Sequence, residues 1–407
     1  MTATLQTFDH STLRNVRIAH VTSVPFFLVT QLKGQMEYLR DIGMQVTMIT
    51  SAGPELAHLT LGPGFEHAVV EIRRKPAPFR DLLALLRMIR LFRQYRFDIV
   101  HSTTPKAGLL TALAGFLARV PVRLHTFTGQ QWVTMSGILR FVSRFSDRMI
   151  GWLNTRCYAD SPSQRQYLID EGILSAERIG VIGSGSLAGV DVMRFRRDRF
   201  LPEERVSLRS ELGIANGARV LVYIGRITRD KGVLELLAAF RNLQAEGIAV
   251  ELLLVGPMEV EGDTQSASLK QALQQSQVHC IGYTNVPERY LAIADILCLP
   301  SYREGFGTVV IEAAAMGVPT VGTRINGLKD AIVECETGLL VEPRNAEALY
   351  AALAGLLAAP EQLARMGTAA RERALQLFNA RQLNQCLVDE YLRLLGDTGR
   401  VSNPRIR

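Results

Sequence analysis

Short apolar runs alternate with longer amphipathic stretches along this chain of 407 residues, and no other feature limits its fold as strongly. Such an alternation is typical of a parallel sheet whose crossover connections are helices that cover its faces. In the first half, the series predicts strands at 16–22, 45–50, 99–101, 123–127, 158–160 and 179–182, with helices at 31–42, 81–96 and 106–117.

A second series begins at residue 219, after a polar and charged stretch with one helix at 203–212. It predicts strands at 220–224, 250–255, 280–282, 296–299 and 320–322, with helices at 233–243, 269–274, 288–293 and 308–316. The last part of the chain predicts only helices, at 346–358, 360–366, 369–378 and 381–395.

The two series predict two α/β domains, each a Rossmann-like doubly wound sheet. Ligands of such sheets bind outside the carboxyl ends of the strands, so we expect the domains to face a central cleft. We place the first domain at 1–195 and the second at 196–378. A C-terminal helix at 379–397 is expected to cross back to the first domain, before a flexible tail at 398–407.

The composition narrows the class of protein further. A net charge of +7 favours anionic partners such as phosphorylated substrates, acidic membrane surfaces or nucleic acid. No nucleic-acid-reading module is visible, so nucleic acid is not an expected partner. The five cysteines form no C-x-x-C pair, which argues against a zinc site and a disulfide framework. Without a secretory signal or an apolar run long enough to span a bilayer, we expect a cytoplasmic protein.

The strongest motif is Pro-Ser-Tyr-Arg-Glu-Gly-Phe-Gly-Thr-Val-Val-Ile-Glu at 300–312. It follows an apolar strand and opens a helix, so its backbone amides could cradle a diphosphate at the helix start. Gly305 and Gly307 let the backbone approach a ligand closely. Glu304 and Glu312 can accept hydrogen bonds from sugar hydroxyls, one from a hexose and one from a ribose. The alternative is a glycine-rich turn with two incidental surface acids.

A second motif, Tyr-Ile-Gly-Arg-Ile-Thr-Arg-Asp-Lys-Gly at 223–232, also lies between a strand and a helix. Arg226 and Lys231 place two cations on one loop, which suits the charge that builds on a leaving diphosphate. The alternative is a solvated basic turn. A weaker motif, Gly282-Tyr283-Thr284, marks a place where a nucleobase could meet main-chain groups, although glycine is common after strands.

Together these motifs resemble the family 4 retaining glycosyltransferases of the GT-B fold. The resemblance rests on the residues and spacing of the segments at 225–232, 282–295, 300–312, 315–321 and 338–341. In the first half, the segments at 101–108, 126–130, 159–163 and 183–191 are similar to a bacterial subgroup that builds polyprenyl-diphosphate-linked glycans.

The resemblance implies a transfer of a hexose or N-acetylhexosamine from a nucleotide-sugar, UDP-linked in most of that subgroup, to a polyprenyl-diphosphate-linked saccharide or similar acceptor. The second domain would bind the donor and the first the acceptor. Arg226 and Lys231 would hold the diphosphate, Glu304 the donor sugar and Glu312 the ribose. Other donor-binding residues would be Gly225, Tyr283, Gly305, Phe306, Gly307, Thr308 and Val309.

The same resemblance suggests a front-face mechanism in which the leaving phosphate helps to deprotonate the acceptor. No metal and no cofactor are expected, because no D-x-D motif stands out and the two cations could replace a metal. Many relatives carry a histidine where this chain has Thr128, and His125 stands three residues earlier. His125 and Thr128 are therefore candidates for the sugar side, unless His125 only ends a strand. Lys106, at a helix start, could meet an acceptor phosphate.

Two stretches predict an attachment to the inner face of a membrane. Residues 73–96 carry eight basic residues and one acid among leucines, isoleucine and phenylalanine. The stretch 137–154 is a second candidate, with the apolar residues Phe141, Phe145, Met149, Ile150 and Trp152. A cationic amphipathic helix can lie on an anionic bilayer. The alternative is an ordinary covering helix with a basic outer face.

Two other functions remain open at this point. One is a GT-B-like nucleotide-sugar epimerase, which would release UDP without an acceptor. The other is a non-catalytic scaffold that binds a sugar nucleotide. The presence of Arg226, Lys231, Glu304 and Glu312 argues against the scaffold.

Overall fold

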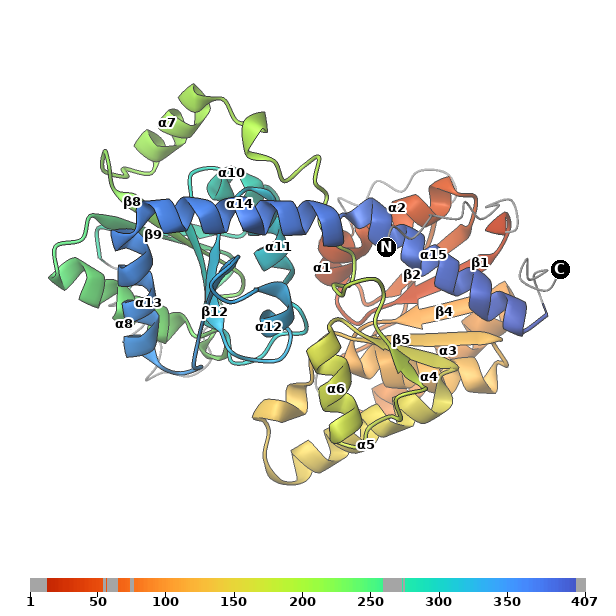
Figure 1. The fold of residues 1–407 in the computed structure, drawn as a ribbon. Coiled ribbons are helices and arrows are strands. Elements are labelled where there is room, and N and C mark those ends of the chain that lie inside the picture. Colours follow the sequence, from red (N-terminus) through yellow and green to blue (C-terminus); the bar gives the residue numbers. More distant parts are fainter. Residues whose placement is uncertain are drawn as a thin grey trace. The chain divides into compact units, whose positions relative to one another are not determined.

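The computed structural model describes residues 13–53, 56, 65–73, 77–258, 273 and 275–399. Apart from residue 273, the predicted helix at 269–274 lies outside the described residues, as do residues 400–407 of the predicted tail. The described chain forms two compact units (Figure 1). Unit 1 holds the described residues up to Ala188 and from Ala380 onward, and unit 2 holds those from Gly189 to Asn379.

Unit 1 contains a seven-stranded sheet in which all neighbouring strands are parallel. The inner strands are buried on both faces, as expected when helices cover a sheet on both sides. In spatial order the strands are β3 (Phe65–Val69), β2 (Gln45–Thr50), β1 (Arg17–Val21), β4 (Ile99–Ser102), β5 (Val122–Phe127), β6 (Arg156–Ala159) and β7 (Ile179–Gly180).

Several helices of unit 1 begin with proline, whose fixed φ and missing N–H suit the first helical turn. The helices are α1 (Pro25–Phe27), η2 (Leu28–Leu32), α2 (Lys33–Asp41), α3 (Pro78–Tyr95), α4 (Pro105–Leu117), η4 (Gln131–Thr134), α5 (Gly137–Leu153), α6 (Pro162–Asp170) and α15 (Ala380–Asp397).

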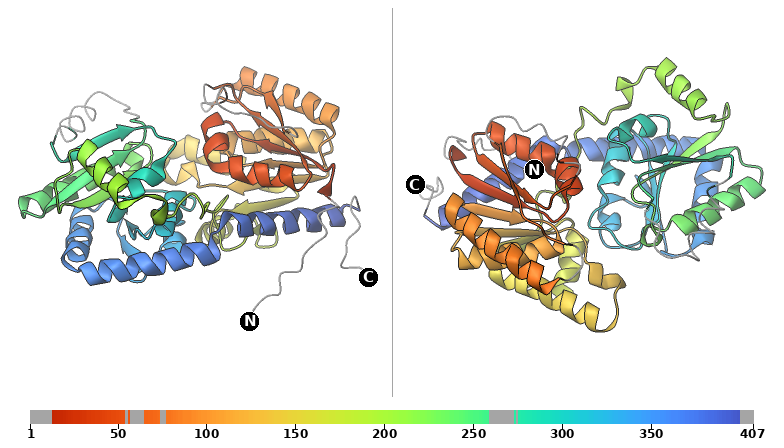
Figure 2. Two further views of the ribbon diagram at one scale, coloured as in Figure 1. Left: turned by 90° about the horizontal axis from the view of Figure 1, so that it is seen from above. Right: turned by 180° about the vertical axis from the view of Figure 1, so that it is seen from behind.

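The last helix, α15, completes the core of unit 1, and it packs on α2 and lies beside β1 (Figures 1 and 2). Val388 and Leu395 are buried there with the core residues of β1 and α2. The hydroxyl of Tyr391 lies 2.7 Å from Nδ1 of the buried His101, and Tyr158 donates to Glu390 Oε1 at 2.7 Å. Packing and buried hydrogen bonds together hold this helix to the sheet.

Unit 2 contains a six-stranded parallel sheet. Its strand order is β10 (Val278–Gly282), β9 (Val250–Val255), β8 (Arg219–Ile224), β11 (Ile296–Leu299), β12 (Thr320–Thr323) and β13 (Gly338–Val341). Its helices are η5 (Arg197–Arg199), α7 (Pro202–Glu211), η6 (Arg229–Lys231), α8 (Val233–Ala245), α10 (Pro287–Leu291), α11 (Thr308–Ala315), α12 (Leu328–Ala331), α13 (Ala346–Ala358) and α14 (Pro360–Leu377).

Unit 2 starts at Gly189, ahead of the boundary that the sequence pattern places at 195. The reason is local, because Val190 is buried in the core of unit 2 and its N–H donates to the carbonyl oxygen of Phe378 at 2.8 Å. Two parallel α/β sheets confirm the predicted fold class.

Candidate active site

The loop after β8 and the loop after β11 meet in unit 2. The two strands are neighbours in a parallel sheet, so their carboxyl ends lie at the same edge. Gly232 lies at the start of α8 with φ of +69°, and a Cβ atom there would come within 2.0 Å of the carbonyl oxygen of Pro300. The two motifs predicted from the sequence therefore touch through their backbones.

Lys231 and Glu304 join these loops by an ion pair. Lys231 Nζ lies 2.6 Å from Glu304 Oε1, and their side chains are only 18% and 15% exposed. Ser301 donates to the same carboxylate oxygen at 2.8 Å. The position and rotamer of Glu304 are thus set by two donors before any ligand arrives.

A second ion pair supports the first. Arg303 Nη2 lies 3.1 Å from Asp230 Oδ2, and Thr228 donates to the other oxygen of Asp230 at 2.6 Å. Burial raises the pKa of Asp230, but the hydrogen bond from Thr228 and then the neighbouring cations hold it below its ordinary value. Asp230 and Ser301 lie within the two motifs but were given no role from the sequence, because the motifs do not show which side chains face Arg303 and Glu304.

The start of α11 offers backbone donors. Gly307 lies at its N-cap with φ of +83°, and no side chain among the described residues caps the helix there. The first amides of the helix, from Thr308 onward, therefore point outward without a side-chain acceptor. Phe306 is 2% exposed and packs on Phe378, with ring centroids 5.1 Å apart. Of Phe306, only the backbone is available to a ligand.

Glu312 lies on α11, near Arg194, a charged residue that was not predicted from the sequence. Burial raises the pKa of Glu312 to about 7, and Arg194 opposes this rise. Arg194 donates to both carboxylate oxygens of Glu288, at 3.0 and 2.7 Å, which fixes its guanidinium beside α10. Glu312 is consequently poised between its ionised and protonated forms near neutral pH.

The remaining donor-side candidates lie at the same edge of the sheet of unit 2. The carbonyl oxygen of Arg226 accepts from the hydroxyl of the buried Tyr223 at 2.6 Å, which fixes the turn that starts at Gly225. Tyr283 follows the end of β10 and is 55% exposed, so its ring is accessible to a ligand.

The acceptor-side candidates of unit 1 are engaged inside that unit. His125 is buried in β5, its Nδ1 lies 2.9 Å from Ser102 Oγ, and burial lowers its pKa to about 3, so it is neutral. Lys106 forms an ion pair with Asp81 at 2.6 Å, and Thr128 donates to the carbonyl oxygen of Thr103 at 3.2 Å. The imidazole ring of His125 is therefore buried inside unit 1.

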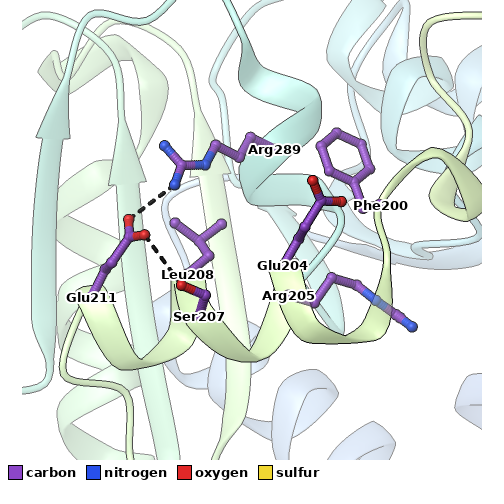
Figure 3. Close-up of a pocket in the computed structure, with 7 residues that line it drawn as sticks. All are labelled: Phe200, Glu204, Arg205, Ser207, Leu208, Glu211 and Arg289. Atoms are coloured by element: carbon purple, nitrogen blue, oxygen red, sulfur yellow. Dashed lines mark hydrogen bonds and ion pairs between the residues drawn. The ribbon is translucent and has the colours of Figure 1, made fainter.

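A surface hollow of about 420 Å³ lies apart from these motifs (Figure 3). Its walls are mixed in charge, with an ion pair of 2.9 Å between Arg289 and Glu211. The hollow lies against α7 and is lined by Phe200, Glu204, Arg205, Ser207, Leu208, Glu211 and Arg289. None of these residues belongs to the two motifs, so we do not place the chemistry there.

Within the described residues, no three His, Cys, Asp or Glu side chains gather closely enough to hold a metal ion. The helices described by the structure also include none that is long and apolar enough to cross a bilayer.

Comparison with known proteins identifies the family. The model for glycosyl transferases group 1 matches residues 204–373, and the model for the glycosyl transferase 4-like domain matches 28–185. The capsular polysaccharide biosynthesis glycosyltransferase CapM of Staphylococcus aureus is 32% identical over 337 residues, which cover 83% of this chain and 86% of CapM. The chain belongs to the family 4 glycosyltransferases of the GT-B fold.

A further relative is similar in sequence, and two solved structures share the fold. The UDP-Gal:alpha-D-GlcNAc-diphosphoundecaprenol alpha-1,3-galactosyltransferase of Escherichia coli is 23% identical over 350 residues, covering 84% of this chain and 88% of that enzyme. Sucrose-phosphate synthase from Thermosynechococcus elongatus has a similar fold, with a TM-score of 0.78, 20% identity and coverage of 94% and 100% of the two chains. HepE from Anabaena, solved with UDP-glucose, has a TM-score of 0.75, 20% identity and coverage of 92% and 99%.

As a family 4 glycosyltransferase with a nucleotide-sugar donor, the chain needs cations and backbone donors for a diphosphate and acceptors for sugar hydroxyls. Unit 2 places both kinds of group at one sheet edge, where Lys231 and the first amides of α11 can donate and the carboxylate of Glu304 can accept.

Proposed function

We propose that this glycosyltransferase moves a hexose or N-acetylhexosamine from a UDP-sugar to a lipid-linked saccharide, with retention of anomeric configuration, during assembly of a bacterial surface polysaccharide. The observation that carries the proposal is the ion pair of Lys231 and Glu304 beside the uncapped start of α11. Two similar proteins support the UDP-sugar donor and the lipid-linked acceptor. The Escherichia coli relative transfers galactose from UDP-Gal to a diphosphoundecaprenol-linked sugar, and the HepE structure holds UDP-glucose.

In the proposed mechanism, unit 2 stabilises the leaving diphosphate. The bond between the anomeric carbon and the phosphate oxygen breaks, and its electron pair stays on UDP. Arg226, Lys231 and the amides of Thr308 and Val309 neutralise this charge where it develops. Glu304 would orient the donor sugar and Glu312 the ribose, which supplies the positioning on which such a reaction depends.

Retention follows from attack on the same face from which the phosphate leaves. The acceptor oxygen bonds to the anomeric carbon, and its proton passes to the departing phosphate oxygen. A retaining glycosidase would instead use a carboxylate nucleophile. Glu304 is a poor nucleophile because Oε1 already accepts from both Lys231 and Ser301.

A polyprenyl-linked acceptor is confined to a bilayer, so we also propose that the protein works as a peripheral protein on the inner face of the cytoplasmic membrane. The acceptor would meet unit 1, near Thr128 and Lys106.

A donor screen with lipid-linked acceptors extracted from membranes tests the function. We expect mass spectrometry to show the glycosyl group of one UDP-sugar attached to the acceptor. We expect NMR of the product to show the same anomeric configuration, α or β, as in the donor. Release of UDP without any acceptor would support an epimerase instead. Binding of UDP without turnover of any donor would support a scaffold.

A further inference from the structure

Helix α5 of unit 1 carries a row of exposed apolar side chains. The row follows the helical repeat along one side, so its members lie above one another. Ile138 is 77% exposed and Trp152 is 68% exposed, and Phe141, Val142 and Phe145 between them are exposed as well. A continuous apolar row of this kind is rare on a protein surface that faces only water.

Helices α3 and α4 extend this apolar surface. Both figures of the fold show α3, α4 and α5 side by side on one face of the sheet of unit 1, and the residues of α4 contact both neighbours (Figures 1 and 2). The ring centroid of Phe116, at the end of α4, is 6.4 Å from that of Trp152. On α3, a second row is exposed at helical spacing, with Phe79, Leu82, Leu83 and Leu86.

The same helices are strongly basic. Arginines stand at positions 80, 87, 90 and 93 of α3, and Arg140, Arg144 and Arg148 on α5. The four arginines of α3 form no ion pair within the described residues, whereas Arg144 is paired with Glu171 at 2.9 Å. Arg140 and Arg148 of α5 also form no ion pair within the described residues, so both helices attract an anion, and α3 carries more of the unpaired arginines.

The acids of these three fully described helices are neutralised or buried. Asp81 is paired with Lys106 at 2.6 Å, and Asp147 is buried and accepts from Trp132 Nε1 at 2.7 Å. The outer face of α3, α4 and α5, which we call the basic apolar face, thus presents arginines and apolar side chains with no opposing carboxylate from its own helices.

A second copy of this chain does not fit the basic apolar face. A symmetric dimer would place the same patch on both sides, so arginines would lie opposite arginines. A bilayer with anionic headgroups fits both features at once, because each nearby Arg adds about 1 kcal/mol and apolar side chains gain by leaving water.

We infer that unit 1 docks on anionic bilayers through the basic apolar face, with the apolar row of α5 inserted between the headgroups and the arginines of α3 held against them. The inference rests on the proposed lipid-linked acceptor for its purpose, and names the surface through which the protein reaches it.

Helix α5 is also linked by a hydrogen bond to the segment that follows the candidate acceptor loop at 128–130. Trp132 lies in η4, directly after the loop of Thr128 to Gln130, and its hydrogen bond to Asp147 ties that segment to α5. Gln164 of α6 donates to Gln130 Oε1 at 3.2 Å and secures the other side of the loop. Docking through α5 therefore fixes the position of Thr128 with respect to the bilayer.

The experiment uses the full chain and vesicles of phosphatidylcholine, with and without phosphatidylglycerol, in a flotation assay. We expect the protein to float with the anionic vesicles at low salt and to remain behind with the zwitterionic ones. The variant Phe141→Gln/Phe145→Gln should weaken binding to anionic vesicles tenfold or more. Arg87→Gln/Arg90→Gln should weaken it too and reduce its dependence on salt.

A matched control removes exposed apolar side chains elsewhere. Leu201→Gln/Val206→Gln lies in the α7 region of unit 2, where both side chains are exposed, and should bind vesicles like the wild type. Equal binding of the α5 variant and this control would overturn the inference, as would the absence of wild-type binding.

Fluorescence gives a second readout. The chain has two tryptophans, and Trp132 is fully buried, so a blue shift on adding anionic vesicles reports on Trp152. We expect the shift in the wild type and its loss in Trp152→Phe. An unshifted wild-type spectrum in the presence of bound vesicles would show that another surface docks.

Transfer to a water-soluble acceptor with a shortened lipid separates this inference from the proposed function. The α5 variant should transfer to the soluble acceptor at the wild-type rate and fail only on vesicles. Vesicle binding through α5 without transfer to any lipid-linked acceptor would leave the docking surface standing and remove the proposed function. If the protein transferred sugar to a lipid-linked acceptor but the α5 variant bound vesicles as well as the wild type, the proposed function would stand and the docking surface would be refuted.

Discussion

Lys231 Nζ lies 2.6 Å from Glu304 Oε1, across two loops whose residues are 73 positions apart in the chain. In the structure each charge neutralises the other, so neither is stranded in a site that is mostly shielded from water. A bound diphosphate would offer Lys231 more oxygens and release Glu304 toward a sugar hydroxyl. The pair thus holds the two loops together.

Removing either partner of this pair should lower activity while the fold survives. We expect Lys231→Ala and Glu304→Ala each to reduce transfer tenfold or more, because the remaining partner loses its positioning as well as its ligand contact. The measurement is kcat/KM for the donor. Arg229→Ala is the control, since Arg229 is an exposed cation on the same loop and should retain wild-type turnover. Normal turnover in either site variant would refute the assignment.

The affinity for UDP should depend on the protonation of Glu312. Burial raises the pKa of this carboxyl to about 7, so it is mainly ionised at pH 8 and mainly protonated at pH 6. An ionised carboxylate is the stronger acceptor for a ribose hydroxyl. We expect UDP to bind several-fold more weakly at pH 6 than at pH 8, by calorimetry.

The variant Glu312→Gln isolates this effect from the titration of UDP itself. It should bind UDP more weakly than the wild type at pH 8 and show a smaller difference between the two pH values. Identical pH profiles for both proteins would show that Glu312 does not contact the nucleotide.

The close approach of Gly232 to Pro300 can be tested against a glycine of similar conformation. Gly217 has φ of +80°, and apart from its chain neighbours no heavy atom of the described residues lies within 4 Å of the point that a Cβ atom would occupy there. Gly217→Ala should therefore lower the free energy of unfolding by about 1–2 kcal/mol, through the strained backbone conformation alone. Gly232→Ala adds a contact of 2.0 Å and should cost about 1–3 kcal/mol more. Thermal unfolding should rank the two variants in that order, and the reverse order would contradict the contact.

Asp147 should make unit 1 less stable as the pH rises. Burial raises the pKa of Asp147 from 3.8 to about 7, so the folded state binds the proton more tightly than the unfolded state. Its contribution to stability is therefore complete below about pH 4 and is lost as the pH rises to about 7. At about 1.4 kcal/mol for each pKa unit, the loss is on the order of 4 kcal/mol. Asp147→Asn should raise the melting temperature at pH 8 and change it little at pH 4.

The exposed Asp170 provides the comparison for this experiment. Asp170→Asn should leave the difference in melting temperature between pH 4 and pH 8 as it is in the wild type. If Asp147→Asn behaved in the same way, the buried carboxyl would not be protonated in the folded state.

The alternation of apolar runs was sufficient to predict the α/β class, because strands buried on both faces are nearly continuous in hydrophobicity. Strand β3 was not predicted, because it lacks such a continuous apolar run. It is an edge strand, and its residues Phe-Glu-His-Ala-Val are half-exposed, so polar side chains interrupt the apolar run. Local sequence carries little information about such a strand, which exists because β2 offers it a parallel partner.

The prediction of two helices at 360–366 and 369–378 was wrong, because α14 runs unbroken from Pro360 to Leu377. Gly367 does not end a helix. It lets α14 approach the chain at Gly317, since a Cβ atom at Gly367 would lie 2.4 Å from the carbonyl oxygen of Gly317. A glycine required by tertiary packing cannot be distinguished from a helix-ending glycine by sequence alone.

The motifs indicated Lys231 and Glu304 but not the residues that position them. Ser301 lies within a motif, yet nothing in its sequence shows that its hydroxyl turns toward Glu304. Arg194 is still further from any motif, and its role beside Glu288 and Glu312 depends on how three distant segments pack. Such partners are fixed by the fold and become visible only with it.

The order in which the units can be finished during synthesis follows from the position of α15. The sequence of unit 2 ends at Asn379, whereas unit 1 needs Val388, Tyr391 and Leu395 from beyond that point. The part of the protein that leaves the ribosome first therefore waits for residues translated later, with His101 lacking its tyrosine partner in the meantime. Unit 2 can close its core while unit 1 is still open, so a chaperone that binds the nascent chain has most to protect at the amino-terminal sheet.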